Sequence, residues 1–248
     1  MSRDFLYDGH SAGELRTMLG VPRIELRDTV GSTLDLTHEL AQSGAPAGTL
    51  VLADSQTKGR GRGGRRWNSE AGSGIWLTLL ERSDGNSAGL LSLRVGLRVA
   101  QAIDVYAGAT VLLKWPNDLY VDGGKVAGIL VESRWRGERL DWTAIGLGIN
   151  VHPPAGVPGA RGLRSGTARI DALRVIVPAM RAAAAASGPL GYEEGRDLAA
   201  RDMARGRQCS QPARGRVCGI SADGALIIDS AAGVIHVRTG SLLLEEDA

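Results

Sequence analysis

The stretch GRGRGGRRW, residues 59–67, combines four arginines with four glycines and ends on a tryptophan. Guanidinium groups suit bidentate contact with phosphate or carboxylate oxygens, and glycines let a loop backbone approach a ligand closely. The first glycines also match the dinucleotide-binding pattern G-x-G-x-x-G, but that pattern must open a helix, whereas this stretch leads toward a second predicted strand. A solvated basic turn explains the stretch equally well, so its interpretation depends on the residues around it.

The segment KWPNDLY, residues 114–120, is a second concentration of side chains that could do chemistry. Lys114, Asn117 and Asp118 surround a proline turn between two predicted strands, although Asn-Asp after proline is also ordinary turn chemistry. A tight DGG turn follows and would bring Lys125 beside Lys114 and Asp118 at one end of a sheet. The pattern indicates a cationic site at a strand end, where functional residues are often placed.

Two further segments offer polar groups at the ends of elements. In GLGIN, residues 146–150, the two glycines permit close approach by a ligand or another backbone, and Asn150 would lie at the strand end. Ser32 and Thr33 precede a short helical pattern, and a capping box is expected to place them at an open helix N-terminus.

Composition argues against several classes of protein. The 248-residue chain carries 29 Lys+Arg against 27 Asp+Glu and has 4% aromatic residues, which disfavours a nucleic-acid-binding module. No stretch approaches the apolar length of a signal-peptide core or a membrane span, so a cytoplasmic protein without membrane association is expected. Four scattered histidines offer no metal-binding spacing, and Cys209 and Cys218 are expected to be small buried hydrophobes rather than a disulfide.

Hydrophobic periodicity places these segments on a sheet of hairpins, with the arginine stretch joining strand to strand. The predicted strands are residues 49–57, 74–82, 110–115, 119–121, 125–135 and 140–151, and the predicted helices are residues 32–44, 88–108 and 170–186. Pro178 is expected to kink or restart the last helix.

The sequence changes character near residue 206, where short strands alternate with turn signals. About forty residues of this kind suggest a small barrel that leans on a larger domain, because alone it would bury a marginal core. We therefore divide the chain into a catalytic domain, residues 1–204, and a C-terminal domain, residues 205–248.

Taken together and in this order, GSTLD, SQTKGRGRGGRRW, KWPNDLY, GGKVAGILVE and GLGIN resemble the catalytic core of the biotin protein ligases. The resemblance is strong over residues 26–151. It implies an α+β fold like that of class II aminoacyl-tRNA synthetases and biotin ligases, with a mixed, largely antiparallel sheet flanked by helices and a C-terminal SH3-like β-barrel. It also implies the ligase-only type, because too few residues precede the core for the DNA-binding domain of relatives that double as repressors.

The resemblance further implies a two-step reaction. ATP and biotin form biotinyl-5′-AMP and pyrophosphate, and a lysine of a biotin carboxyl carrier domain then attacks the mixed anhydride. Bringing two anions together requires cations, and Lys125 and Arg62 match the family's catalytic positions. Mg²⁺ is expected to bridge ATP phosphates with help from Asp118, so no protein metal site is assigned. The expected partner is a carboxylase carrier domain, with no nucleic acid or membrane, and the chain is expected to be a monomer or homodimer.

The same resemblance assigns individual roles. Ser32, Thr33 and Gln56 match positions that hydrogen-bond the ureido end of biotin, and Arg60 approaches biotin and the phosphates. The full set of expected ligand-binding residues is Ser32, Thr33, Leu34, Gln56, Gly59, Arg60, Gly61, Arg62, Trp67, Lys114, Asn117, Asp118, Lys125, Gly128, Gly148 and Asn150.

Further roles concern the adenine and the apolar rings. Asn117 and Asn150 resemble adenine-side contacts, and Trp67, Ile129 and Leu130 would line an apolar slot for the fused rings of biotin.

The sequence departs from the family pattern at several positions. Leu34 stands where the family often has Asn, so the third biotin contact is made by backbone or lost. Lys58 and Gly63 also differ from the usual loop residues, and the tail LLLEEDA shows no equivalent of the basic residue that some relatives present.

Three other functions remain open from the sequence. A lipoate or octanoate protein ligase shares the architecture, a nucleic-acid-binding protein could grip phosphates with the arginine stretch, and Leu34 hints at a catalytically inactive biotin sensor.

Overall fold

The computed structural model describes residues 5–82 and 88–245 of the chain. The helices are α1 (Ala12–Leu19), α2 (Thr33–Gln42), α3 (Ala88–Ala107), α4 (Arg169–Ala185) and α5 (Tyr192–Arg201). The strands are β1 (Ile24–Val30), β2 (Leu50–Gln56), β3 (Gly74–Glu81), β4 (Leu112–Lys114), β5 (Asp118–Val121), β6 (Gly124–Arg136), β7 (Arg139–Asn150), β8 (Gln208–Gln211), β9 (Gly215–Ile220), β10 (Leu226–Ser230), β11 (Gly233–Val237) and β12 (Leu243–Leu244).

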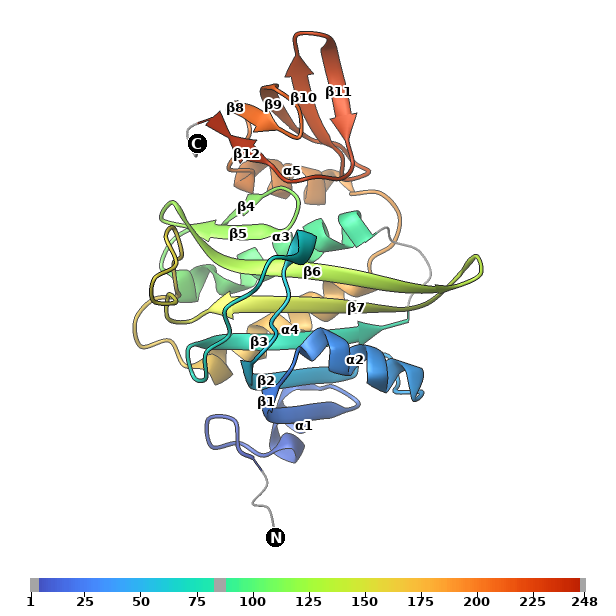
Figure 1. Cartoon of the computed structure of the whole chain (residues 1–248), viewed down its shortest axis with the longest axis vertical. Coiled ribbons are helices and arrows are strands. Elements are labelled where there is room, and N and C mark those ends of the chain that lie inside the picture. The colour runs from blue at the N-terminus through green and yellow to red at the C-terminus, as the bar shows by residue number, and fades with distance from the viewer. Residues whose placement is uncertain (1–4, 83–87, 246–248) are drawn as a thin grey trace.

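A seven-stranded sheet in the order β1-β2-β3-β7-β6-β5-β4 forms the centre of the molecule (Figure 1). Strands β1 and β2 are parallel, and every other neighbouring pair is antiparallel. The turn between β5 and β6 places Asp122 at φ 48° and Gly123 at φ 72°, the left-handed values that a tight two-residue hairpin requires. The predicted α+β fold with a mixed, largely antiparallel sheet is confirmed.

Helices cover both faces of this sheet, which explains the unbroken apolar run of β3. Helices α3 and α4 pack against each other on one face, and α2 lies on the other with the loop that joins β2 to β3 (Figure 1). Alternate residues of β3 therefore enter different cores, because side chains along a strand point to opposite faces. Leu79 belongs to the large core, whereas Leu80 packs with Trp142 and Ala41 beneath α2.

Two expectations about helices need correction. Helix α4 continues through Pro178 rather than restarting there, since burial of Ile176 and Val177 against the sheet layer outweighs one lost backbone hydrogen bond. Helices α1 and α5 lie outside the predicted set because their apolar faces are short, each with one or two buried residues.

A second sheet of five antiparallel strands, in the order β11-β10-β9-β8-β12, forms the C-terminal part of the molecule. It leans on the larger part through Trp115, whose Nε1 donates to the carbonyl oxygen of Gly224 at 3.1 Å. Gly224 itself lies against Leu90 and Leu93 of α3. The boundary between residues 204 and 205 stays a prediction.

The sequence also predicts the state of the cysteines and the absence of a membrane-spanning segment. Cys209 and Cys218 are free thiols as expected, but Cys218 is exposed rather than buried because it lies on the outer face of β9. No helix in the described residues is long and apolar enough to cross a membrane.

Candidate functional site

A pocket opens on the face of the large sheet that carries α2 and the arginine loop (residues 59–67). Its empty volume is about 460 Å³, part of which is open to solvent. The expected ligand-binding residues line it except Gly59, Lys114, Asp118 and Asn150. Segments that lie far apart along the chain therefore meet at one pocket.

The N-terminus of α2 forms one end of this pocket, and it is capped by a tertiary contact. Ser32 occupies the N-cap position, but its hydroxyl makes no capping bond within the described chain, so the predicted capping box is wrong. Gln56 at the end of β2 replaces it, because its Oε1 accepts the backbone N–H of Thr33 at 2.8 Å. This substitution leaves the buried Ser32 hydroxyl available to the pocket that it lines.

Gln56 is thus a structural brace of the pocket as well as a residue that lines it. Its Oε1 also accepts the Thr33 hydroxyl at 3.1 Å, and its Nε2 donates to the Ser69 hydroxyl at 2.8 Å. The Thr33 hydroxyl accepts from Thr78 of β3 at 2.9 Å. These bonds fix α2, β2 and β3 relative to each other and to the segment that follows the arginine loop.

The arginine loop is a short hairpin between β2 and β3, as the sequence predicted for its connection. The Trp67 N–H donates to the Gly59 carbonyl at 2.9 Å, and the Gly61 N–H donates to the Arg65 carbonyl at 2.8 Å. Its tip turns through Gly63 at φ 64°, a left-handed conformation that glycine adopts without steric cost. The hairpin holds the Gly61–Arg62 segment over the pocket.

One glycine of GLGIN, Gly148, makes room for a tryptophan together with Gly128. Gly128 and Gly148 are direct partners on β6 and β7. A Cβ on Gly148 would lie 2.5 Å from Trp67 Nε1, and one on Gly128 would lie 3.1 Å from the same indole. Trp67 also packs edge-on against Trp76, with ring centroids 6.4 Å apart. The indole therefore rests on two side-chain-free backbone positions.

Leu34 fills the space left by another glycine. A Cβ on Gly146 would lie 3.1 Å from Leu34 Cγ and Cδ1, so the leucine packs against the bare backbone of β7. An apolar side chain at this position gives the pocket hydrophobic surface. Leu130 and Ile129 both line the pocket, as expected, although the Ile129 side chain also reaches Gly96 of α3 on the opposite face of β6.

Two cations lie at the mouth of the pocket, next to a carboxylate. Lys125 Nζ is 2.7 Å from Asp118 Oδ1 and 5.2 Å from the Trp67 ring centroid. Arg62 Nη1 donates to Asn117 Oδ1 at 3.3 Å. Burial lowers the pKa of Arg62 while the charge of Asp118 raises it, and guanidinium stays ionised in proteins. The arrangement presents positive charge to any anion that enters.

The Arg60 guanidinium is paired with carboxylates of the protein itself. Its two terminal nitrogens donate to both oxygens of Glu132, at 2.9 and 2.8 Å, and one of them lies 3.1 Å from Asp35. No pattern in the sequence points to Glu132, which lies on β6 four residues beyond the glycine of KVAGILVE.

The remaining expected residues support the site from its edges. Lys114 is buried, with Nζ 5.4 Å from the Tyr120 ring centroid. Asn150 donates through Nδ2 to the carbonyl oxygens of Arg161 at 3.1 Å and Lys125 at 3.4 Å. Gly59 packs beneath Trp67, where a Cβ would lie 2.5 Å from the tryptophan carbonyl oxygen.

Unpaired buried polar atoms gather at this pocket. Among the described residues, the lining residues Ser32, Arg60 and Trp67 each have a buried side-chain atom without a hydrogen-bond partner. Buried polar groups without partners are costly, so they are placed where a ligand satisfies them.

For a metal, residues 5–82 and 88–245 offer no group of three His, Cys, Asp or Glu side chains. The donor set fits Mg²⁺ held mainly by phosphate oxygens.

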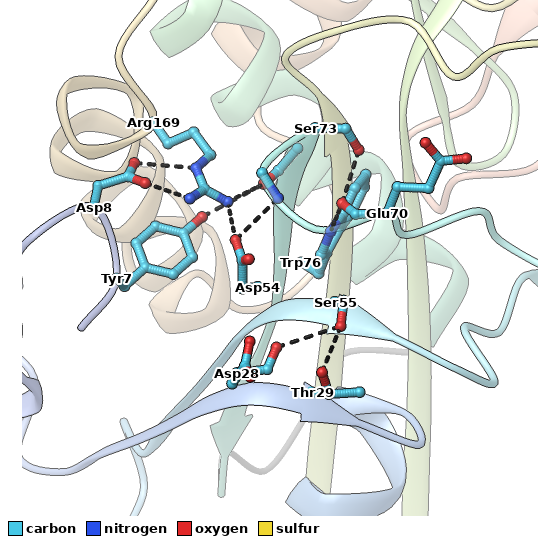
Figure 2. Close-up of polar contacts among 12 residues, drawn as sticks. Tyr7, Asp8, Asp28, Thr29, Asp54, Ser55, Glu70, Ser73, Trp76 and Arg169 are labelled. Atoms are coloured by element: carbon cyan, nitrogen blue, oxygen red, sulfur yellow. Dashed lines mark hydrogen bonds and ion pairs between the residues drawn. The ribbon is translucent and has the colours of Figure 1, made fainter. Parts of the chain in front are cut away.

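A buried ionic cluster anchors the segment that leaves the arginine loop. Arg169 at the start of α4 donates to both carboxyl oxygens of Asp8, to Asp54 and to the Gly74 carbonyl, with its guanidinium 4.2 Å from the Tyr7 ring centroid (Figure 2). Burial raises the pKa of the Tyr7 hydroxyl far above its usual range. Asp54 also accepts the Gly72 N–H at 3.1 Å. The cluster joins the N-terminal segment, β2, α4 and the turn before β3.

Comparison with known proteins agrees with this geometry. The sequence profile of the Biotin/lipoate A/B protein ligase family matches residues 27–150, half of the chain. The bifunctional ligase/repressor BirA of Bacillus spizizenii is 41% identical over 140 residues, which cover 56% of this chain and 43% of that protein. The biotin–[acetyl-CoA-carboxylase] ligase of Paracoccus denitrificans is 39% identical over 127 residues, 50% of this chain and 51% of that protein. The aligned region thus spans about half the length of these relatives.

A solved structure extends the likeness beyond this region. The biotin protein ligase from Aquifex aeolicus in complex with biotin and ATP superposes with a TM-score of 0.75 at 25% identity, covering 90% of this chain and 99% of that one.

Proposed function

The chain belongs to the Biotin/lipoate A/B protein ligase family, and from that premise we propose that it is an ATP-dependent biotin–protein ligase. The observation that carries the proposal is a pocket that combines the apolar residues Leu34 and Leu130 with the cations Arg62 and Lys125 and the unpaired hydroxyl of Ser32. Biotin has matching parts: apolar fused rings, a polar ureido group and a carboxylate on a chain.

In the first step, an oxygen of the biotin carboxylate attacks the α-phosphorus of ATP. The bond from that phosphorus to the bridging oxygen breaks, and pyrophosphate leaves with the bonding electrons. Lys125 and Arg62 offset the repulsion between carboxylate and phosphate, since cations placed in advance stabilise charge without reorganisation. Mg²⁺, when bound with ATP, supplies further positive charge at the phosphate oxygens, with Asp118 beside Lys125 as the carboxylate available to it.

In the second step, the ε-amine of a carrier-domain lysine attacks the acyl carbon of biotinyl-5′-AMP. The bond from that carbon to the phosphate oxygen breaks, AMP leaves, and the amine loses a proton as the amide forms. The arginine loop keeps water from the anhydride by covering it between the steps. No enzyme nucleophile takes part in either step.

The proposed partner is the biotin carboxyl carrier domain of acetyl-CoA carboxylase or a related carboxylase, as the names of curated relatives suggest. A cytoplasmic location and a monomeric or homodimeric state stay predictions from the sequence.

One assay tests the proposal. The protein is incubated with Mg-ATP and an apo carrier domain, with biotin, lipoate or octanoate in parallel, and the carrier is analysed by intact mass. Addition of a biotinyl group to one lysine is expected. Labelling by lipoate or octanoate instead would assign the other branch of the family, and no labelling by any acid would contradict the ligase function.

A further inference from the structure

A buried hydrogen-bond chain leads from the second core to the arginine loop. Trp142 Nε1 on β7 donates to Nδ1 of His38 on α2 at 2.9 Å. Nε2 of His38 then lies 2.8 Å from Oε2 of Glu132 on β6. Glu132 in turn accepts both terminal nitrogens of Arg60 in the arginine loop. Four residues from four different elements thus form one continuous chain.

The direction of each bond in this chain is fixed by chemistry. An indole N–H only donates, so Nδ1 of His38 must accept, and the proton of the neutral ring lies on Nε2. His38 therefore donates to Glu132, and the carboxylate is held from behind while it faces Arg60. Trp142 is 7% exposed and the His38 side chain is 8% exposed, so this support is shielded from competing water.

We infer that Glu132 is a positioning residue that latches the arginine loop over the pocket by holding Arg60, with His38 and Trp142 fixing its orientation. A bidentate arginine–carboxylate pair has two parallel bonds and a defined plane, which suits it to set the position of a loop. Asp35, exposed on the first turn of α2, adds a second carboxylate 3.1 Å from Arg60. This inference rests on the proposed function only for its effect on biotin.

The latch sets the fraction of molecules whose arginine loop is closed and ready to bind biotin. If only molecules with a closed loop bind biotin, the apparent affinity equals the affinity of the closed form multiplied by the closed fraction. The rate at saturation is preserved. A weakened latch should therefore raise KM for biotin and leave kcat nearly unchanged. A general loss of folded protein would lower the measured kcat instead.

Limited trypsin digestion tests the latch without any ligand. Trypsin cuts after arginine, and the loop carries Arg60, Arg62, Arg65 and Arg66, which are cut only when the loop lifts from the protein. Glu132→Gln keeps the shape of the side chain and removes its charge. We expect cleavage in the loop to become roughly five to ten times faster, the change that loss of one partly exposed charge-assisted pair gives.

A matched control separates the latch from general destabilisation. Glu194→Gln breaks another two-bond arginine–carboxylate pair, with Arg94, where the bonds are 3.0 and 3.1 Å, outside the pocket. It should leave cleavage of the arginine loop unchanged. Equal acceleration by both variants would overturn the inference.

A double-mutant cycle shows whether Glu132 acts through Arg60. In an Arg60→Ala background, Glu132→Gln should change loop cleavage by less than about twofold, because the partner is already gone. Arg60→Lys keeps the charge but loses the bidentate fork, and an intermediate acceleration of about threefold is expected. An unchanged cleavage rate in both Glu132→Gln and Arg60→Lys would overturn the latch even if one of them folds poorly.

Kinetics complete the test. Glu132→Gln should raise KM for biotin only about twofold with kcat unchanged, because the changes in the open and closed fractions multiply to the one change in the loop equilibrium, most of which appears in the cleavage rate. A fall in kcat at unchanged KM would contradict a positioning role. Because trypsin cleavage requires no substrate, a failed latch and a failed assignment of biotin as substrate are distinguishable.

Discussion

Two arginine sites of this molecule show how the surroundings decide what an arginine does. Arg169 is enclosed by Asp8, Asp54 and a backbone carbonyl, and its donors are consumed within the fold (Figure 2). Arg62 makes one hydrogen bond, 3.3 Å long, to a side chain in the described part of the molecule, and it lines an open pocket. The first site joins parts of the chain, and the second keeps its charge available for a ligand.

Removing Arg169 should have the largest effect on the fold. Arg169→Met leaves two carboxylates without their cation in a site where the arginine side chain is 10% exposed, so we expect a loss of about 3–5 kcal/mol of unfolding free energy. Urea denaturation measures it. Arg136→Met, which breaks a pair whose arginine is 85% exposed, should cost less than about 1 kcal/mol. Similar losses in the two variants would refute the structural role.

Removing Lys125 should have the largest effect on chemistry. Lys125→Ala is expected to slow biotin-dependent pyrophosphate release about 10²- to 10³-fold, because a cation placed for the transition state is lost. Its urea midpoint should stay near that of the unmutated protein, since the side chain is partly exposed. Lys58→Ala, an exposed lysine just before the arginine loop, is the control. Unimpaired release in Lys125→Ala would show that the catalytic site lies elsewhere.

Arg62 sharpens the contrast with Arg169 directly. Arg62→Ala should change the unfolding free energy little, yet release biotinyl-5′-AMP about tenfold faster, because a charge-assisted contact to the ligand is lost. Rapid dilution of enzyme loaded with radiolabelled adenylate measures the release. Arg65→Ala, whose guanidinium is exposed and contacts Ser241 in the segment before β12, should release it at the normal rate. The prediction fails if both variants leak equally.

Acid should weaken the Glu132 pair within a defined range of pH. The hydrogen bond from His38, followed by Arg60, lowers the pKa of Glu132 to about 2 from the ordinary 4.5. A carboxyl group whose pKa is lowered in the folded state stabilises the fold at pH values above its ordinary pKa. This contribution is lost as the pH falls from about 4.5 toward 2. After allowance for solvent screening we expect about 1–2 kcal/mol.

The stability difference between the unmutated protein and Glu132→Gln should therefore be full at pH 6 and smaller at pH 3.5. Urea titrations at both values measure it. A difference that grows toward acid would contradict the lowered pKa.

Ser32→Ala should have the smallest effect of these changes, and it should lower biotin affinity without lowering stability. Its hydroxyl has no hydrogen-bond partner among the described residues, so Ser32→Ala should leave stability within about 0.5 kcal/mol. Biotin affinity, measured by calorimetry, should fall a few-fold because one hydrogen bond to the ligand is lost. A stability loss as large as that of a true N-cap would mean that the hydroxyl caps α2 after all.

Much of the site could be predicted because it is built from local patterns. The arginine stretch, the proline turn at Asn117 and the hairpin that carries Lys125 were each recognisable from residue type and spacing. The strand-to-strand position of the arginine loop followed from the apolar runs on either side. Glu132 and His38 were not predictable, since a glutamate on a strand and a histidine on a helix carry no signal until the two elements pack together.

By itself, the sequence determined the family, the strand and helix pattern of the centre of the chain, and which residues would meet at one pocket. Only the tertiary structure decided how their hydrogen bonds are shared: Gln56 caps α2 and so frees Ser32, Trp67 rests on Gly128 and Gly148, and Glu132 holds Arg60. The reason is physical. Periodicity and turn chemistry act between near neighbours in the chain, whereas the partner of a polar group is set by which distant elements fold against it.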